Sequence, residues 1–234
     1  MIPSLQNILD FFEKNACALE VKPEHLQLSR LCDFCHPSLF KLREKLVGNL
    51  SEPAKIANGV YHFLQEKILY EFDAWPILAS ETASKGTGMC FNKTNLMIAL
   101  LRASRIPCVY TLFWIGKEGF RFTADEKMLE KIQPKTVHVY AEAYLGNKMG
   151  WRRYVDTSFD TRLRRVLQKQ GYEPFRNIVS ELPIERFATA EEVIAWRQKY
   201  KESIGATETI GLEEMEKSNR RLRELRKQGN LSLL

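Results

Sequence analysis

Apolar residues recur with helical spacing in the first part of the chain. Between residues 4 and 50 they form two successive faces, which predicts helices there. The first face comprises Leu5, Ile8, Leu9, Phe11 and Phe12, and the second comprises Leu39, Leu42, Leu46 and Val47. Ser51 begins a further helix with Pro53 in its first turn, where proline is tolerated. Residues 70–80 are expected to form a loop.

The middle of the chain changes from helical to strand patterning. A helix that begins near Cys90 carries an apolar face and must stop before Pro107. Residues 108–114 are rich in β-branched and aromatic side chains, as in a buried strand. Residues 136–145 and 151–156 predict two more strands joined by a short turn. The order indicates an antiparallel meander that follows the Cys90 helix.

The rest of the chain returns to polar and helical patterns. Residues 117–135 are polar and predict a surface excursion between two strands. A short helix is expected after Asp160, and Thr189 with Glu192 forms a capping box that opens another helix. A last, heavily charged helix over 212–227 has a thin apolar stripe at Leu222 and Leu225. Helices followed by an antiparallel meander define an α+β fold.

The expected organisation is one domain with helical additions at both ends. Residues 1–50 form an N-terminal extension, 51–165 the core and 166–234 a C-terminal extension. Of the 234 residues, 44% are hydrophobic and 27% are charged, as in ordinary soluble proteins. No apolar run approaches the roughly 20 residues of a membrane span, and the first residues lack the basic region of a signal peptide. The expected location is cytoplasmic, and the five cysteines are expected to be free thiols.

The net charge of +6 is partly local. A basic cluster follows the second strand of the meander and comprises Arg152, Arg153, Arg162, Arg164, Arg165 and Lys169. A solvated face is the plain interpretation, and a docking surface for an acidic protein or carrier domain is the functional one. Nucleic acid is not expected, because no aromatic platform or known module accompanies the charge.

Cys90 is the first candidate for chemistry, since it stands between a glycine-containing stretch and the apolar helix. A thiol in the first turn of a helix lies at the positive end of the helix dipole, which favours a nucleophilic thiolate. The flanking glycines, Gly86 and Gly88, allow another backbone to approach. The alternative is that Cys90 is a small buried hydrophobe.

A cysteine nucleophile needs a base, and the chain has four histidines. Strand alternation places His138 on one face with Tyr140, Glu142 and Tyr144, which suits a strand that lines a cleft. The third group, which fixes the imidazole tautomer, is expected to be Asp156 at the end of the next strand. Asp160 lies past that strand and fits less well.

Three segments together resemble the transglutaminase-like superfamily. They are Ala79–Pro107 with the run Gly-Thr-Gly-Met-Cys90, then His138–Leu145, then Trp151–Thr157, in the order cysteine, histidine, aspartate. Ser104 and Arg105 depart from the family pattern of a small residue and a glycine before Ile-Pro. The chain is similar to the compact bacterial members, and the additional domains of animal transglutaminases are not expected.

The resemblance implies a papain-like fold with Cys90 as nucleophile, His138 as general base and acid, and Asp156 as orienting group. It also implies an oxyanion hole built from the Cys90 backbone N–H and an upstream side chain, with Trp75 and Tyr70 as candidates. No metal or cofactor is expected.

The implied reaction is attack on an amide or acyl thioester, followed by transfer of the acyl group to an amine or to water. A peptidase or amidase that uses water alone, a thiol protease in effect, is one alternative, and a catalytically silent binding module is another. A metal-dependent hydrolase at Cys32, Cys35 and His36 is a weaker alternative, because no second ligand pair exists. The expected partners are peptide, amide or acyl-thioester substrates and an acidic carrier, with no membrane; the oligomeric state stays open.

Overall fold

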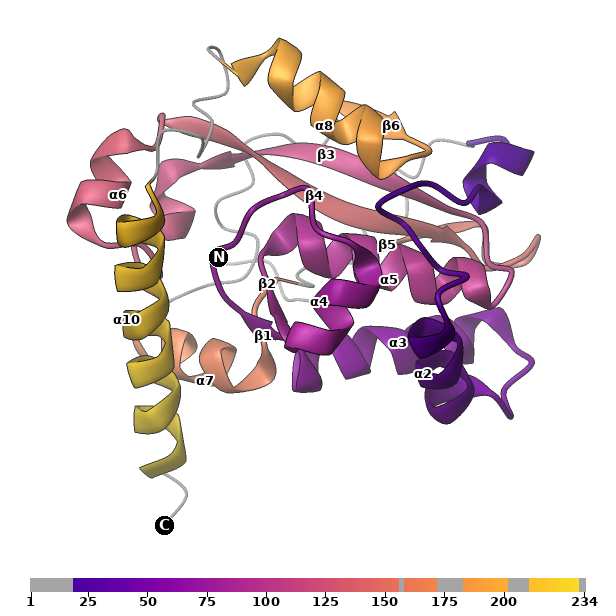
Figure 1. The fold of residues 1–234 in the computed structure, drawn as a ribbon, viewed down its shortest axis with the longest axis horizontal. Helices are drawn as coiled ribbons and strands as arrows, with labels where there is room; N and C mark the ends of the chain where they lie inside the picture. Colours follow the sequence, from indigo (N-terminus) through magenta and orange to yellow (C-terminus); the bar gives the residue numbers. More distant parts are fainter. Residues whose placement is uncertain (1–18, 156–157, 172–182, 202–210, 232–234) are drawn as a thin grey trace, which may run out of the picture.

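The computed structural model describes residues 19–155, 158–171, 183–201 and 211–231 (Figure 1). The N-terminal half contains η1 (Pro23–Leu26), α2 (Pro37–Val47), α3 (Pro53–Lys67), β1 (Leu69–Tyr70), α4 (Ala79–Lys85), β2 (Thr87–Gly88), α5 (Cys90–Ala103) and β3 (Cys108–Gly116). The C-terminal half contains η2 (Lys117–Phe120), α6 (Glu126–Lys131), β4 (Lys135–Tyr144), β5 (Trp151–Tyr154), α7 (Thr161–Lys169), β6 (Glu185–Phe187), α8 (Ala190–Lys199) and α10 (Leu212–Leu231).

The main sheet has four strands in the order β5-β4-β3-β6, and each neighbouring pair is antiparallel. β3 and β4 form the longest pair, running from Cys108 opposite Ala143 to Gly116 opposite Lys135. The strand β5 is shorter and pairs with β4 only from Ala141 to Tyr144. Among the described residues, no β5 residue pairs with β4 between its start and Ala141.

The helix α5 forms the centre of the molecule. Every residue from Cys90 to Arg102 is buried, and the apolar ones belong to one large core cluster. α5 packs against β3 and β4 on one side and against α2, α3 and α4 on the other, as the ribbon view shows (Figure 1). A helix that is enclosed on all sides can carry polar residues only where they find partners inside the protein.

The α+β fold with helical flanks is the one that the sequence predicts. The helices expected near Ser51, Cys90 and Asp160 are present, as is the meander, and the capping box of Thr189 and Glu192 opens α8. The first predicted helical face, over residues 5–12, lies outside the described residues. The three predicted domain boundaries stay predictions.

Several short elements were not predicted. β1 and β2 are two residues each and pair in parallel, and β6 is only three residues long. The helix α6 lies inside the polar excursion, and α4 lies at the end of the predicted loop. Elements this short span too few residues to show a periodic pattern. In the parts of the chain that the structure describes, no helix combines the length and apolar character needed to cross a membrane.

Candidate active site

Cys90 is the first residue of α5, and it is buried with an exposed fraction of 5%. Its setting is made by the residues on either side. Gly86 adopts the left-handed conformation, with φ of 66°, and ends α4. A Cβ at Gly88 would lie 2.9 Å from the Cβ of Asn92. The two glycines therefore serve a turn and close internal packing, whereas the sequence suggested room for a substrate backbone.

The first turn of α5 packs against the open edge of β4. Hydrogen bonding from the Val139 backbone reaches the Cys90 sulfur. One turn along the helix, Thr94 Oγ1 donates to the Val139 carbonyl at 3.1 Å. The described pairing of β4 with β5 begins at Ala141, and at Val139 the contacts of β4 come from α5. Cys90 is thereby placed beside the residue that follows His138.

His138 lies on β4, opposite Phe113 of β3, and is half-buried. Its ring contacts Tyr140 edge-on, with 4.6 Å between the ring centroids. His138 Nε2 lies 3.0 Å from the hydroxyl oxygen of Ser158. Both Cys90 and His138 are among the described residues, and no hydrogen bond joins their side chains there. Cys90 therefore contacts the backbone of the residue next to His138, and the pairing of the two side chains stays a prediction.

Asp156 lies outside the described residues, so its role as orienting group stays a prediction. Asp160, the less favoured carboxylate, is engaged elsewhere. Its carboxylate accepts hydrogen bonds from the backbone N–H groups of Tyr70 and Leu163 and pairs with Arg226 at 2.7 Å. This carboxylate caps α7 and has no contact with His138.

The protonation states differ from the sequence expectation of a thiolate. Burial raises the pKa of the Cys90 thiol to about 11, although backbone hydrogen bonding and the charge of Arg197 act in the opposite direction. Burial also lowers the pKa of the His138 imidazole to about 4. At neutral pH the resting pair is therefore an uncharged thiol and an uncharged imidazole.

Trp75, one of the two predicted oxyanion donors, lies close to the nucleophile helix. Its indole stacks on Phe91, with 4.8 Å between ring centroids, and the guanidinium of Arg197 lies 4.2 Å from the centre of the indole. Asn92 Nδ2 donates to the carbonyls of Ala74 and Trp75, which ties this loop to the first turn of α5. Trp75 Nε1 is buried and has no hydrogen-bond partner in the described part of the chain. Such a donor is unusual and needs a reason.

Tyr70, the other predicted donor, belongs to the scaffold of the loop. Its ring packs edge-on against Phe72 and Phe159, and its backbone is held by Asp160 and Arg226. Of the two candidates, Trp75 is the one that the structure places against α5.

The predicted basic surface divides into two parts. Arg153 is buried, bonds Glu142 at 2.7 Å and lies over the ring of Phe113, so it belongs to the interior. Arg162 and Arg165 are exposed on α7, and Arg152 and Arg164 are half-buried. Docking of an acidic partner on this face stays a prediction.

The Cys-x-x-Cys-His segment has a structural role at the start of α2. The ring of His36 accepts a hydrogen bond from the Ser38 backbone N–H, while Cys32 is buried and Cys35 is exposed. Among the described residues, no group of three or more histidine, cysteine and acidic side chains could hold a metal ion. Cys32, Cys35, Cys90 and Cys108 are free thiols, and Cys17 lies outside the described residues.

Two polar residues of the site were missed by the sequence reasoning. Ser158 contacts His138, and Lys93, which is fully buried on α5, donates to the carbonyls of Ile68 and Ser158 at 2.7 and 2.8 Å. Ser158 lies past the end of β5, where no periodic pattern of the sequence marks it. A lysine at 93 is three residues from Cys90, a spacing that puts both on the same face of a helix.

An α+β fold in which a buried cysteine opens the central helix, beside a histidine-bearing antiparallel sheet, defines a papain-like architecture. Residues 41–155 match the model of the Transglutaminase-like superfamily. This segment is just under half of the chain, and its similarity to that superfamily supports a cysteine-based enzyme in general.

Two further comparisons were made. Among curated proteins none matches the chain. Among solved structures the chain is similar to a "Putative Cysteine Protease from Cytophaga hutchinsonii", with 21% sequence identity and a TM-score of 0.48. The similarity covers 72% of this chain and 47% of that protein, so the chain matches about half of the neighbour's length.

Proposed function

We propose that this protein is a thiol acyltransferase or hydrolase that acts through an acyl-enzyme on Cys90. Its substrate is an amide or an acyl thioester, and the acyl group passes to an amine or to water. The observation that carries the proposal is the placement of Cys90 at the start of α5, against the Val139 backbone next to His138, with the unpartnered Trp75 indole N–H nearby. These positions support a nucleophile at Cys90 and a base at His138, with Trp75, which stacks on the neighbouring Phe91, as the oxyanion donor.

In the proposed acylation step, the Cys90 sulfur bonds to the substrate carbonyl carbon and its proton passes to His138. Nε2 of His138 faces Ser158, so Nδ1 is the nitrogen that takes this proton, while Nε2–H donates to the Ser158 hydroxyl. The bond to the leaving amine or thiol then breaks, and the imidazolium returns the proton to that group. Deacylation repeats the transfer with an amine or water as the attacking group.

The proposal is tested by presenting short acyl thioesters and amides with and without a saturating primary amine. Release of thiol or ammonia and formation of a new amide are measured separately by mass spectrometry. A new amide identifies an acyltransferase, and free acid alone under saturating amine identifies the hydrolase alternative. A binding module that keeps the fold would give neither product.

The pH dependence of kcat/KM follows from the two uncharged groups. His138 must be neutral to accept the proton, so activity should fall only as the pH drops through about 4. We expect kcat/KM to be nearly constant from about pH 5 to about pH 10, because the thiol deprotonates only near pH 11. Initial rates over this range, with circular dichroism at each pH to verify folding, provide the measurement. An acid limb near pH 6.5 would contradict the buried neutral imidazole.

Trp75 supplies the second oxyanion donor in this proposal. Its side-chain N–H has no partner among the described residues, which leaves it available for the negative oxygen of the tetrahedral intermediate. Trp75→Phe keeps an aromatic ring on Phe91 but removes the N–H, and it should lower kcat by about 10²- to 10³-fold with little change in KM. Trp196→Phe, which alters a half-buried tryptophan of α8, is the matched control. Equal rates for Trp75→Phe and wild type would exclude this role.

A further inference from the structure

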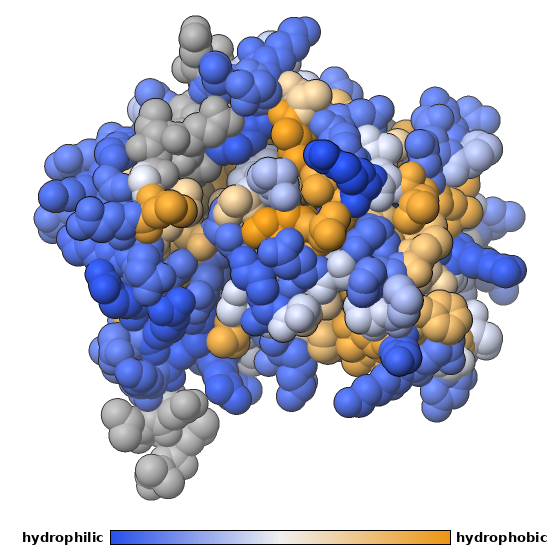
Figure 2. Space-filling view, viewed as in Figure 1, coloured by the Kyte–Doolittle hydropathy of each residue, from blue (hydrophilic) through white to orange (hydrophobic). Residues whose placement is uncertain are grey.

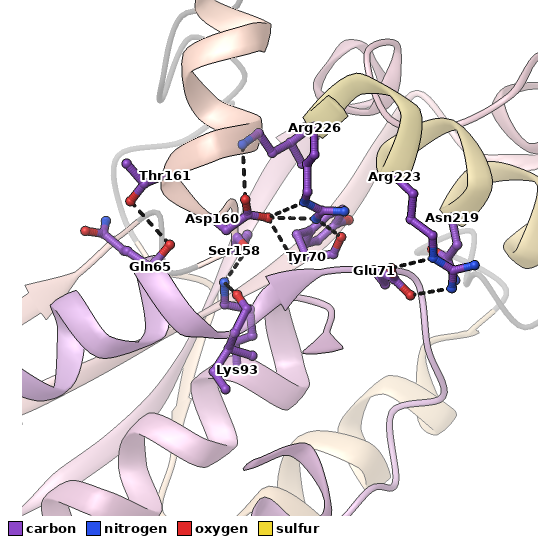
Figure 3. A network of polar contacts seen from close by, with 12 residues as sticks. Gln65, Tyr70, Glu71, Lys93, Ser158, Asp160, Thr161, Asn219, Arg223 and Arg226 are labelled. Carbon is purple, nitrogen blue, oxygen red and sulfur yellow. Dashed lines mark hydrogen bonds and ion pairs between the residues drawn. The ribbon is translucent and has the colours of Figure 1, made fainter. Parts of the chain in front are cut away.

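The C-terminal helix α10 lies outside the segment that matches the superfamily, and its buried face packs on α6, α7 and segments that lead to the candidate active site. The buried residues of α10 recur at helical spacing and form one stripe: Ser218, Asn219, Leu222, Leu225 and Arg226. The two leucines join the main core cluster. Ser218 faces α6, through Asp125 and Met128. Asn219 and Arg226, together with Arg223, contact two segments that flank the site (Figure 3).

The first of these segments is residues 70–72, and α10 holds each residue in turn. Arg226 donates to the Tyr70 carbonyl. Arg223 binds both carboxylate oxygens of Glu71, at 2.8 and 2.9 Å. Asn219 pairs with both backbone groups of Phe72, accepting from its N–H at 2.7 Å and donating to its carbonyl at 2.9 Å. Backbone pairing of this kind fixes a segment whatever its own side chains are.

The second segment is residues 158–160. Arg226 donates to Asp160 from both Nε and Nη2, at 3.0 and 2.7 Å, and the same carboxylate accepts from the Tyr70 N–H. The guanidinium thus bridges the two segments. On the α5 side, Lys93 joins the carbonyl of Ser158 to that of Ile68, two residues before Tyr70. The two segments are therefore held between α5 and α10 (Figure 3).

Both segments lead directly to groups of the site. Residues 70–72 run into the loop that carries Trp75, and Tyr70 pairs with Gly88 just before Cys90. Asp160 follows Ser158, the partner of His138, by two residues. Because a buried ion pair adds little to stability compared with apolar packing, the arginine and aspartate pairing has its clearest use in setting position.

We propose that Arg226 is a positioning residue of the catalytic centre, which acts through Asp160 and the Tyr70 carbonyl to hold Ser158 against His138 and the Trp75 loop against α5. The inference rests on the function proposed above. In this proposal α10 positions catalytic groups of its own chain, so the helix is needed for full activity.

Arg226→Met tests the inference, because methionine keeps the buried hydrocarbon and removes both bridging contacts. We expect kcat to fall by about 10- to 100-fold with KM within about twofold, as for a misplaced catalytic group. Arg221→Met is the matched control: it makes the same substitution on the same helix, where Arg221 donates to the Ala124 carbonyl at 3.1 Å. An equal loss in Arg221→Met would overturn the inference, since it would reflect general loosening of α10.

A second readout does not depend on turnover. The pKa of His138 is measured by NMR in protein carrying labelled histidine, with His138→Gln to assign its signal among the four histidines. In Arg226→Met the pKa of His138 should move from about 4 toward the ordinary 6.5, because Ser158 no longer holds the ring in its buried place. Arg221→Met should leave it unchanged. An unchanged His138 titration together with unchanged kcat in Arg226→Met would overturn the inference.

If wild type shows no turnover, the proposed function fails and the His138 titration alone decides the positioning role. If Arg226→Met does not fold, Arg226→Lys replaces it, because lysine keeps a charge beside Asp160 but lacks the fork that reaches both segments. We expect Arg226→Lys to fold with kcat still reduced. Wild-type kcat and an unchanged His138 titration in Arg226→Lys would overturn the inference.

Discussion

Replacing Cys90 with alanine should reduce turnover of acyl thioesters and amides by at least about 10⁴-fold, the loss typical of removing a covalent nucleophile. Every step of the proposed reaction passes through the sulfur, and each other described thiol lies outside the Val139 edge. The loss should appear in kcat, because substrate binding does not require the thiol. Initial rates at saturating substrate provide the measurement.

The control for this variant is the same substitution at Cys32, a fully buried thiol in the main core cluster. Cys32→Ala creates a comparable small cavity and should retain kcat within about twofold, even if it lowers the free energy of unfolding slightly. Circular dichroism verifies that both variants fold. A loss of less than tenfold in Cys90→Ala, or equal losses in both variants, would rule out Cys90 as the nucleophile.

Asp160→Asn should destabilise the fold by about 3–5 kcal/mol, because it leaves the buried Arg226 guanidinium without a counter-charge. Asparagine is as good a helix N-cap as aspartate, so α7 keeps its cap through Oδ1, whereas the ion pair and the hydrogen bond from the Tyr70 N–H, which share Oδ2, are lost. Urea unfolding provides the measurement. Asp125→Asn is the matched control: Asp125 caps α6 and pairs with Lys217, whose side chain is 57% exposed, so the cost should stay below about 1 kcal/mol. Similar costs for the two variants would contradict the account of the Arg226 pair.

The pair of Asp160 and Arg226 also makes the free energy of unfolding depend on pH in acid. Burial alone would raise the pKa of Asp160, but Arg226 and two backbone N–H groups outweigh it, so the pKa lies below the ordinary 3.8. The stabilisation is therefore fully present above pH 3.8 and is lost as the pH falls through the lowered pKa. Asp160→Asn should remove this acid-dependent part of the unfolding curve.

Long periodic segments made the fold class predictable from the sequence. The helix of Cys90 and the strand of His138 were readable because each has a distinct pattern: an apolar helix after glycines, and an alternating strand. These patterns place Cys90 and His138 on the elements where the structure has them. They depend on local sequence alone, which is why they could be read in advance.

The remaining features depend on contacts between distant segments. The position of Cys90 at a helix N-terminus favoured a thiolate. Burial of α5 on all sides instead raises the pKa of the thiol. This burial depends on contacts with distant segments, so the local sequence does not show it. Lys93 gave no signal either, because its two carbonyl partners lie 25 and 65 residues away in sequence. The sequence of the last helix showed only a thin apolar stripe, whereas Arg226 of α10 is buried against a carboxylate 66 residues earlier.

The central claim, an acyl-enzyme on Cys90, is tested most directly by trapping it. Wild-type protein is quenched in acid during turnover of an acyl thioester, and its intact mass and peptides are measured. We predict a mass increase of one acyl group on the peptide that contains Cys90, absent from Cys90→Ala treated in the same way. Turnover without any adduct on Cys90, or an adduct found only on the exposed Cys35, would contradict the account.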